Sequence, residues 1–226
     1  MSHILDRPIW HALVTRHARF AVGAPPVLRY PPDIEPFIAA ADDSQASADA
    51  MLPLIEPGET LLLIQASRAT VPRGAVVETE RLGVQMVADG LTFSPEPPAG
   101  AGPLGDADAA EMIALAQLTK PGPFQSRTHT MSQFFGIRRE GRLVAMAGER
   151  MQLPGYSEVS GVCSHPDWRG HGFARDLSVF IASRITARGE TPFLHAWADN
   201  VAAIRLYETL GFTLRSEMPT MAIRRA

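Results

Sequence analysis

Cysteine, net charge and long apolar runs are all scarce in this chain of 226 residues. Its single cysteine excludes an internal disulfide and is typical of a reducing compartment, so we expect a cytoplasmic protein. A net charge of −3 offers no basic surface for a polyanion, and nucleic acid is not an expected partner. No apolar run reaches membrane-spanning length, and Asp6 and His11 interrupt the N-terminus where a signal peptide needs apolar residues. No membrane partner is expected.

Residues 159–174 are the stretch on which the interpretation of the whole chain depends. Residues 159–163 are β-prone, and His165-Pro166-Asp167 predicts a turn after them, because proline cannot continue a central strand. After a glycine turn at 169–172, apolar residues recur about every 3.6 positions from Phe173, which predicts a helix. The order is therefore strand, glycine loop, helix.

A glycine-rich turn that opens a helix is a ready anion site. Its unpaired N–H groups lie at the positive end of the helix dipole, and Gly170 and Gly172 allow a ligand close to the backbone. No Gly-Lys-Ser/Thr follows as in a Walker A loop, and the first glycine of a dinucleotide fingerprint is missing. We expect the loop to hold a pyrophosphate.

A second strand and helix follow this unit. Residues 191–198 predict a short apolar strand, and Asn200 offers an N-cap to the next helix. Tyr207 lies on the apolar side of that helix, which Gly211-Phe212 closes.

From about residue 104 to 226 the chain resembles the GNAT superfamily of N-acyltransferases. Residues 169–174 look like its acyl-coenzyme A loop, and residues 200–212 look like its C-terminal signature. The same half is also similar to glycine N-acyltransferases. The resemblance implies an α/β fold with a mixed, mostly antiparallel sheet flanked by helices. It also implies acetyl transfer from acetyl-CoA to the primary amine of a small molecule or amino acid, by direct attack and without a metal.

The resemblance assigns the coenzyme A site to the central strand, the glycine loop and the start of the last helix. Backbone groups of the strand would contact the thioester and the pantetheine arm, and the loop would hold the phosphates. The expected cofactor-binding residues are Val162, Ser164, Arg169, Gly170, His171, Gly172, Phe173, Ala174 and Asn200.

Two residues are candidates for proton transfer. Tyr207 occupies the position from which the family's tyrosine protonates the departing sulfur, and an ordinary tyrosine is protonated at neutral pH. Glu158 begins the central strand and is a candidate general base, or a group that holds the ammonium. His165 is a rival base, although a turn role is favoured for it. For His195 and Trp197, packing and acceptor contact cannot be distinguished.

Other reactive side chains are interpreted more plainly. Cys163 has no legible His-Asn or His-Asp arrangement, so a packed thiol is favoured over a nucleophile. The irregular segment 121–131 corresponds to the part of the family's fold that lines the acceptor site, which makes Phe124, Arg127 and His129 candidates.

The first hundred residues carry no sign of the family. The proline- and glycine-rich segment 95–103 predicts a linker between an N-terminal α/β domain of unknown role, residues 1–94, and the GNAT domain, residues 104–226. A degenerate second copy of the same fold is one alternative for residues 1–94. A homodimer is an arrangement that the sequence allows.

Local patterns predict the remaining elements. Asp6 and Pro8 predict the start of a helix, and Asp108 with Glu111 predicts a capping box that opens another. Glu140-Gly141 predicts the turn of a hairpin. The expected strands are 60–65, 76–80, 82–87, 132–138 and 143–151.

Three alternatives to acetyl transfer remain at this stage. One is an enzyme with a longer acyl donor. Another is a non-catalytic acyl-CoA-binding module or sensor, in which the N-terminal part covers the acceptor cleft. The third is a protein-binding N-terminal domain with the GNAT half as a scaffold, which only the linker supports. A sensor needs the loop alone, so Tyr207 and Glu158 together favour an enzyme.

Overall fold

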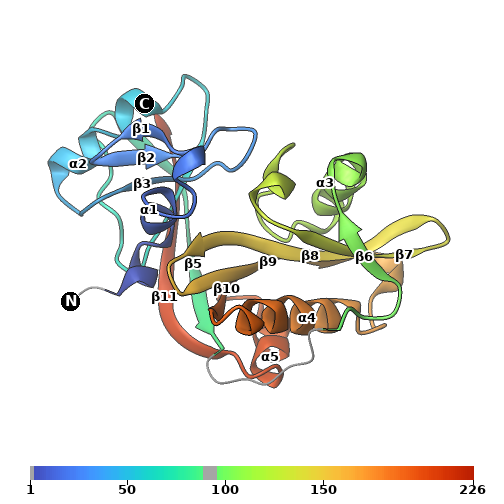
Figure 1. The fold of residues 1–226 in the computed structure, drawn as a ribbon. Helices are drawn as coiled ribbons and strands as arrows, with labels where there is room; N and C mark the ends of the chain where they lie inside the picture. The colour runs from blue at the N-terminus through green and yellow to red at the C-terminus, as the bar shows by residue number, and fades with distance from the viewer. Residues whose placement is uncertain (1–2, 89–95) are drawn as a thin grey trace.

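The computed structural model describes residues 3–88 and 96–226, which contain one large and one small β-sheet (Figure 1). All neighbours in the large sheet are antiparallel except β9 and β10, which are parallel. In order across it, its strands are β4 (Leu61–Ile64), β11 (Thr213–Arg225), β5 (Ala75–Val87), β10 (Thr191–Trp197), β9 (Tyr156–Ser164), β8 (Arg142–Leu153), β7 (Phe134–Arg139) and β6 (Ala101–Leu104). The small antiparallel sheet consists of β1 (Val22–Ala24), β2 (Val27–Arg29) and β3 (Ile38–Ala40).

Helices cover both faces of the large sheet. On one face lie α4 (Phe173–Ala187) and α5 (Val201–Thr209). On the opposite face lie α1 (Pro8–Leu13), α3 (Ala109–Thr119) and the small sheet with α2 (Gln45–Asp49) (Figure 1). Short 3₁₀ helices are Ile4–Asp6, Ala18–Phe20, Leu52–Leu54, Asp106–Asp108, Thr128–Met131 and Pro166–Trp168.

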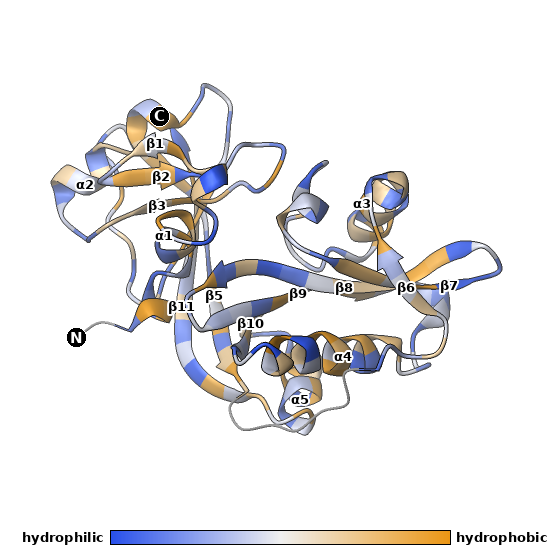
Figure 2. Ribbon diagram, viewed as in Figure 1, coloured by the Kyte–Doolittle hydropathy of each residue, from blue (hydrophilic) through white to orange (hydrophobic). Residues whose placement is uncertain are grey.

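The core beneath the sheet is built on α4. Its apolar residues recur at helical spacing, and Leu177 and Ile181 are fully buried against the sheet. Phe180 meets the Phe135 ring edge-on at 4.9 Å between centroids. In Figure 2 the helix carries apolar and hydrophilic segments along its length, as expected of a helix with one buried side. The helix predicted from Phe173 is confirmed.

The N-terminal residues form a second core on the other face. Leu5, Ile9 and Leu13 are buried against Met151 of β8 and Phe193 of β10. The start of the chain therefore covers the face of the large sheet opposite α4, next to the place where β9 and β10 meet.

The strands predicted at 76–80 and 82–87 are a single strand, β5, which corrects the sequence interpretation. It lies between β10 and β11, and β11, the C-terminal strand, pairs with it over nearly its whole length. The large sheet thus takes two strands, β4 and β5, from residues 3–88, and these described residues do not repeat the topology of the C-terminal half. The division at 95–103 stays a prediction: residue 95 lies outside the described residues, and Ala101 to Pro103 pair with β7.

The capping box predicted at Asp108 and Glu111 is absent from α3. The Asp108 carboxylate accepts from the N–H of Gly105, and Glu111 accepts from Leu143 and Arg138 instead. The expected β7–β8 hairpin is confirmed, and Glu140-Gly141 turns with positive φ angles of 53° and 78°.

Candidate active site: the cleft between β9 and β10

The site begins where two parallel strands separate. β10 pairs with β9 only from Thr191 to Phe193, and the last of these pairs joins Phe193 to Glu158. Beyond Glu158, β9 continues to Ser164 beside β8 alone, while β10 continues beside β5. The edge of β9 from Val159 onward therefore faces a gap instead of a neighbouring strand.

A β-bulge explains this divergence. Between the pairs Met146/Cys163 and Gly148/Ser160, β9 uses one residue more than β8, and Gly161 takes a left-handed φ of 64°. The Phe134 ring lies under the bulge, since a Cβ on Gly161 would be 2.8 Å from its Cε1 atom. A bulge bends its strand, which turns β9 away from β10.

The gap opens into a cavity of about 860 Å³. It reaches from the start of α4 on one face of the sheet to the end of α3 on the other. Its walls are β9 from Val159 to Ser164, the loop and helix start from Trp168 to Arg175 except His171, His195 to Trp197 of β10, Asn200 with one side of α5 as far as Tyr207, and Thr119 to Pro123 at the end of α3. Leu62, Ile64, Gly83, Arg150, Met218 and Thr220 complete it.

One end of the cavity is suited to an anion. Gly170 and Gly172 both have a φ of 81°, a conformation that favours glycine, and nothing lies within 4 Å of a Cβ built on Gly170. Gly172 is the N-cap of the 15-residue α4 and makes no side-chain capping bond. The N–H groups of the first turn therefore face the cavity without a side-chain acceptor, and Arg169 adds positive charge, whereas Arg175 pairs with Asp176 at 3.1 Å.

The cavity brings together nearly all the residues expected from the sequence. Val162, Ser164, Arg169, Gly170, Gly172, Phe173, Ala174, Asn200 and Tyr207 all line it. His171 does not: its Nδ1 lies 3.1 Å from the carbonyl oxygens of Trp168 and Arg169, so its ring closes the loop on itself. Asn200 also caps α5, since its Oδ1 accepts from Ala203 at 3.2 Å.

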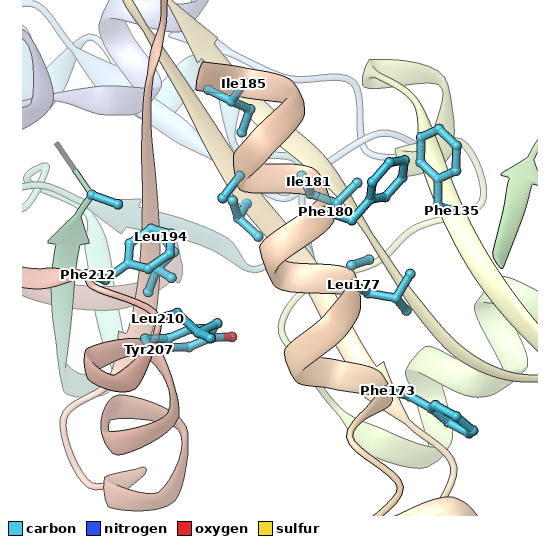
Figure 3. Close-up of a cluster of buried hydrophobic side chains, with 14 of the residues drawn as sticks. Phe135, Phe173, Leu177, Phe180, Ile181, Ile185, Leu194, Tyr207, Leu210 and Phe212 are labelled. Carbon is cyan, nitrogen blue, oxygen red and sulfur yellow. The ribbon is translucent and has the colours of Figure 1, made fainter. Parts of the chain in front are cut away.

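Tyr207 reaches the cavity from α5. Its ring meets Phe212 edge-on, and its hydroxyl lies on the side of α4 (Figure 3). Burial raises the pKa of Tyr207 to about 12 and that of the nearby Cys163 to about 11. Both are therefore protonated at neutral pH, and Cys163 is not a thiolate nucleophile there.

Glu158 lies just outside the cavity lining, and both of its carboxylate oxygens accept hydrogen bonds. Arg150 donates to its carboxylate through Nε and Nη2 at 2.9 and 2.8 Å, and the Met151 N–H donates at 3.2 Å. His195 Nδ1 is 2.7 Å from Oε1. Burial alone would raise the pKa of Glu158, but the charge and hydrogen bonds of Arg150, with the hydrogen bond of His195, hold it well below its usual range. The group is ionised and is a weak base.

A second bulge places Arg150 for this contact. Between the pairs Glu149/Val159 and Gln152/Ser157, β8 uses one residue more than β9, and Arg150 and Met151 occupy the extra length. Both then donate to the same carboxylate. The Arg150 guanidinium also lies over the Phe37 ring, 5.0 Å from its centroid.

The hydrogen bonds around Glu158 extend through His195 to side chains on two further strands. Arg215 of β11 donates to Gln85 Oε1 at 2.8 Å, so the Gln85 amide nitrogen faces His195 Nε2 at 3.0 Å and the Leu5 carbonyl at 3.1 Å. His195 Nε2 must accept this bond, and its proton sits on Nδ1, toward Glu158. A polar ladder thus joins β11, β5, β10, β9 and β8, and it occupies both nitrogens of His195.

Several of these residues were not predicted. Gln85 and Arg215 act through partners far away in the chain. Arg150 bonds to Glu158 on the next strand, and its only sequence signal was Glu149-Arg150 within an apolar strand. In the segment after α3, Arg127 pairs with Asp33. His129 pairs with Asp106, and Phe124 packs on Phe134. None of these three candidates lines the cavity; Thr119 to Pro123 do so instead.

A buried acid beside the ladder makes stability depend on pH. Glu35 is fully buried, and neither carboxylate oxygen has a hydrogen-bond partner among the described residues. Burial raises its pKa from 4.5 to about 8, against the opposing charge of Arg150. The folded state holds this proton and the unfolded state releases it, so stability falls as pH rises through this window.

We expect the free energy of unfolding to fall by about 2 kcal/mol between pH 6 and pH 8 through this group alone. Urea unfolding across the range measures it. Glu35→Gln should remove this part of the slope, whereas Glu56→Gln, at an exposed position, should keep it. An unchanged slope in Glu35→Gln would contradict the assignment.

Comparison with known proteins identifies the class that this fold and cleft define. The family model described as FR47-like protein matches residues 134–220. A solved structure assigned to the GNAT acetyltransferase family, from Novosphingobium aromaticivorans, superposes with a TM-score of 0.93 at 38% identity and covers 100% of both chains. The chain belongs to the GNAT family of acetyltransferases.

Two further comparisons are more limited. A GCN5-related N-acetyltransferase from Kribbella flavida superposes with a TM-score of 0.64 at 17% identity, over 96% of this chain and 95% of that chain, and shares the fold. Mycothiol acetyltransferase from Mycobacterium avium is 36% identical over 88 residues, which are 34% of this chain and 28% of that protein. The chain thus matches less than a third of that relative. The likeness to glycine N-acyltransferases stays a prediction.

Within residues 3–88 and 96–226, no helix is long and apolar enough to cross a membrane. The same residues contain no cluster of His, Cys, Asp or Glu side chains that would hold a metal ion.

Proposed function

We propose that this protein transfers an acetyl group from acetyl-CoA to the primary amine of a small molecule or amino acid. The observation that carries the proposal is a shared cavity: the uncapped start of α4, the open edge of β9 and Tyr207 all face it. A cytoplasmic location agrees with the single buried cysteine, which has no disulfide partner.

Coenzyme A supplies an activated thioester, and the residues of this chain would bind and orient it. The α4 N–H groups and Arg169 would hold the phosphates. Because of the bulge, Val162 has no register partner on β8. Val162 and Ser164 would offer backbone groups to the thioester and the pantetheine arm. An oxyanion that develops on the carbonyl is stabilised by such preorganised donors.

In the reaction, the amine nitrogen forms a bond to the thioester carbon, and the bond from that carbon to sulfur breaks. Tyr207 would give its hydroxyl proton to the departing sulfur and regain one from water. The raised pKa suits a group that must enter each cycle protonated.

Glu158 is better placed to position than to accept a proton. Its two oxygens accept four hydrogen bonds, and one of these would have to break before it took a proton from the amine. We therefore propose that it holds Arg150 and His195 at the vertex of the cleft, which is the point where β9 and β10 separate after the pair Phe193/Glu158. The amine would lose its proton to water in the cavity mouth.

Calorimetric titration of acetyl-CoA, propionyl-CoA and free coenzyme A tests the proposal. Wild-type protein should bind acetyl-CoA, and Gly172→Val should weaken this by about tenfold or more, because valine disfavours the left-handed backbone and crowds the phosphates. Gly189→Val is the matched control: Gly189 has a φ of 75° and does not line the cavity, and a Cβ there meets nothing within 4 Å, while one on Gly172 makes only an ordinary contact with Asp176 at 3.7 Å.

Equal loss of affinity in both variants would mean that backbone strain, not the phosphate site, is responsible. Binding without release of free thiol in the presence of amines would favour the non-catalytic acyl-CoA-binding module. Tighter binding of propionyl-CoA would point to a longer acyl donor.

A further inference from the structure

The cavity is lined by cations and by no acid. Among the described residues that line it there is no aspartate or glutamate. Two of its four cations, Arg169 and Arg175, belong to the phosphate end at α4. The other two are Lys120, at the end of α3, and Arg150, whose guanidinium lies over Phe37 of the N-terminal part, so both lie away from the α4 end, on the side where the proposed donor would place its acceptor.

Arg150 keeps one donor atom for a ligand. Its Nε and Nη2 atoms bind Glu158, whereas Nη1 has no hydrogen-bond partner among the described residues. The side chain is only 9% exposed, yet Nη1 is not among the buried atoms that lack both a partner and solvent. Since Arg150 lines the cavity, the cavity is where Nη1 meets solvent.

Lys120 is the only lysine in the chain. It ends α3 in a left-handed conformation with a φ of 52°, is exposed, and makes no side-chain hydrogen bond or ion pair with a described residue. A cation at a helix C-terminus is favourable in itself. Lys120, however, also lines both the main cavity and a smaller adjoining hollow of about 280 Å³, together with Gly122 and Trp197.

We propose that the acceptor is an amine that also carries a carboxylate, and that Arg150 Nη1 and Lys120 bind this carboxylate. The inference rests on the proposed acetyl transfer, since it names the acceptor of that reaction. A carboxylate would give each cation a charge-assisted hydrogen bond, which neither receives for these donors from the protein. A polyamine would bring extra positive charge to a wall that offers no carboxylate to pair with it.

Matched acceptors test the proposal. Free-thiol release from acetyl-CoA is measured with 5-aminopentanoate against pentylamine, lysine against cadaverine, and glycine and phenylalanine against their amides. Calorimetry with acetyl-CoA comes first: absence of binding would refute the proposed function itself. With binding established, the carboxylate member should be preferred by about tenfold or more in kcat/KM for at least one pair.

Equal rates within every pair, faster turnover of the carboxylate-free amines, or no turnover of any carboxylate would overturn the inference. Variants of Lys120 then locate the contact. Lys120→Gln should raise KM for the preferred carboxylate by about three- to tenfold and leave acetyl-CoA affinity unchanged. Lys120→Arg keeps the charge and should restore KM.

Arg225→Gln is the control, because Arg225 is an exposed cation at the end of β11, away from the cavity. It should leave KM unaltered. If Lys120→Gln raised KM equally for the carboxylate and for its amide or amine partner, Lys120 would not bind the carboxylate.

Discussion

Glu158→Gln is expected to lower the free energy of unfolding by about 3 to 5 kcal/mol, because it leaves the buried Arg150 guanidinium without its counter-charge. The arginine is held between β8 and Phe37 and is only 9% exposed, so water can replace little of the lost counter-charge. Denaturant unfolding at neutral pH measures the loss.

An exposed pair gives the matched control. Glu80→Gln removes the partner of Arg68, and these side chains are 39% and 58% exposed, so the loss should stay below about 1 kcal/mol. Because the pKa of Glu158 is lowered in the folded state, its contribution is present above the unfolded value near 4.5 and is lost as pH falls further. Similar losses in both variants would show that Arg150 finds another partner.

Much of the fold could be predicted because its signals are local. The change of apolar period at Phe173 located α4, and Asn200 located the start of α5. Turn chemistry at Glu140-Gly141 located the β7–β8 hairpin. Each of these patterns lies within one element or one connection, so no knowledge of distant contacts is needed.

The place of β5 could not be predicted in this way. Its residues read as two short strands, 76–80 and 82–87, with a break at the charged Arg81. In the structure, Arg81 pairs with Asp199, Glu80 with Arg68 and Glu78 with Arg224, so the charges are satisfied beside a continuous strand. Its neighbours, β10 and β11, come from the other end of the chain, and local propensity cannot choose them.

The same distinction between local and distant signals applies to the residues of the site. The proposed phosphate end is local, since the loop and the helix start are contiguous, and the cavity gathers those residues except His171. The vertex of the cleft is not local. Glu158 could be named as a carboxylate on the central strand. The hydrogen bonds that occupy both of its oxygens come from Arg150, from His195 and from a β-bulge, and no local sequence pattern predicts this bulge.

Tyr207→Phe is expected to lower kcat by about a hundredfold and to leave the affinity for acetyl-CoA unchanged. Phenylalanine preserves the contact with Phe212 and the packing against α4, and only the hydroxyl proton is lost. With a pKa of about 12, Tyr207 keeps this proton throughout the range in which the protein would be assayed, so the wild-type rate should not decline from its ionisation below about pH 10.

Tyr156→Phe is the matched control for this substitution, because Tyr156 also loses only a hydroxyl, one that lies 3.3 Å from His3 at the far end of β9. Its kcat should be that of the wild type. Steady-state rates from thiol release and calorimetric affinities separate the two effects, since a packing defect would change binding as well as turnover. Should Tyr207→Phe turn over at the wild-type rate, the thiolate must take its proton from water, and Tyr207 would serve only as part of the wall between α5 and α4.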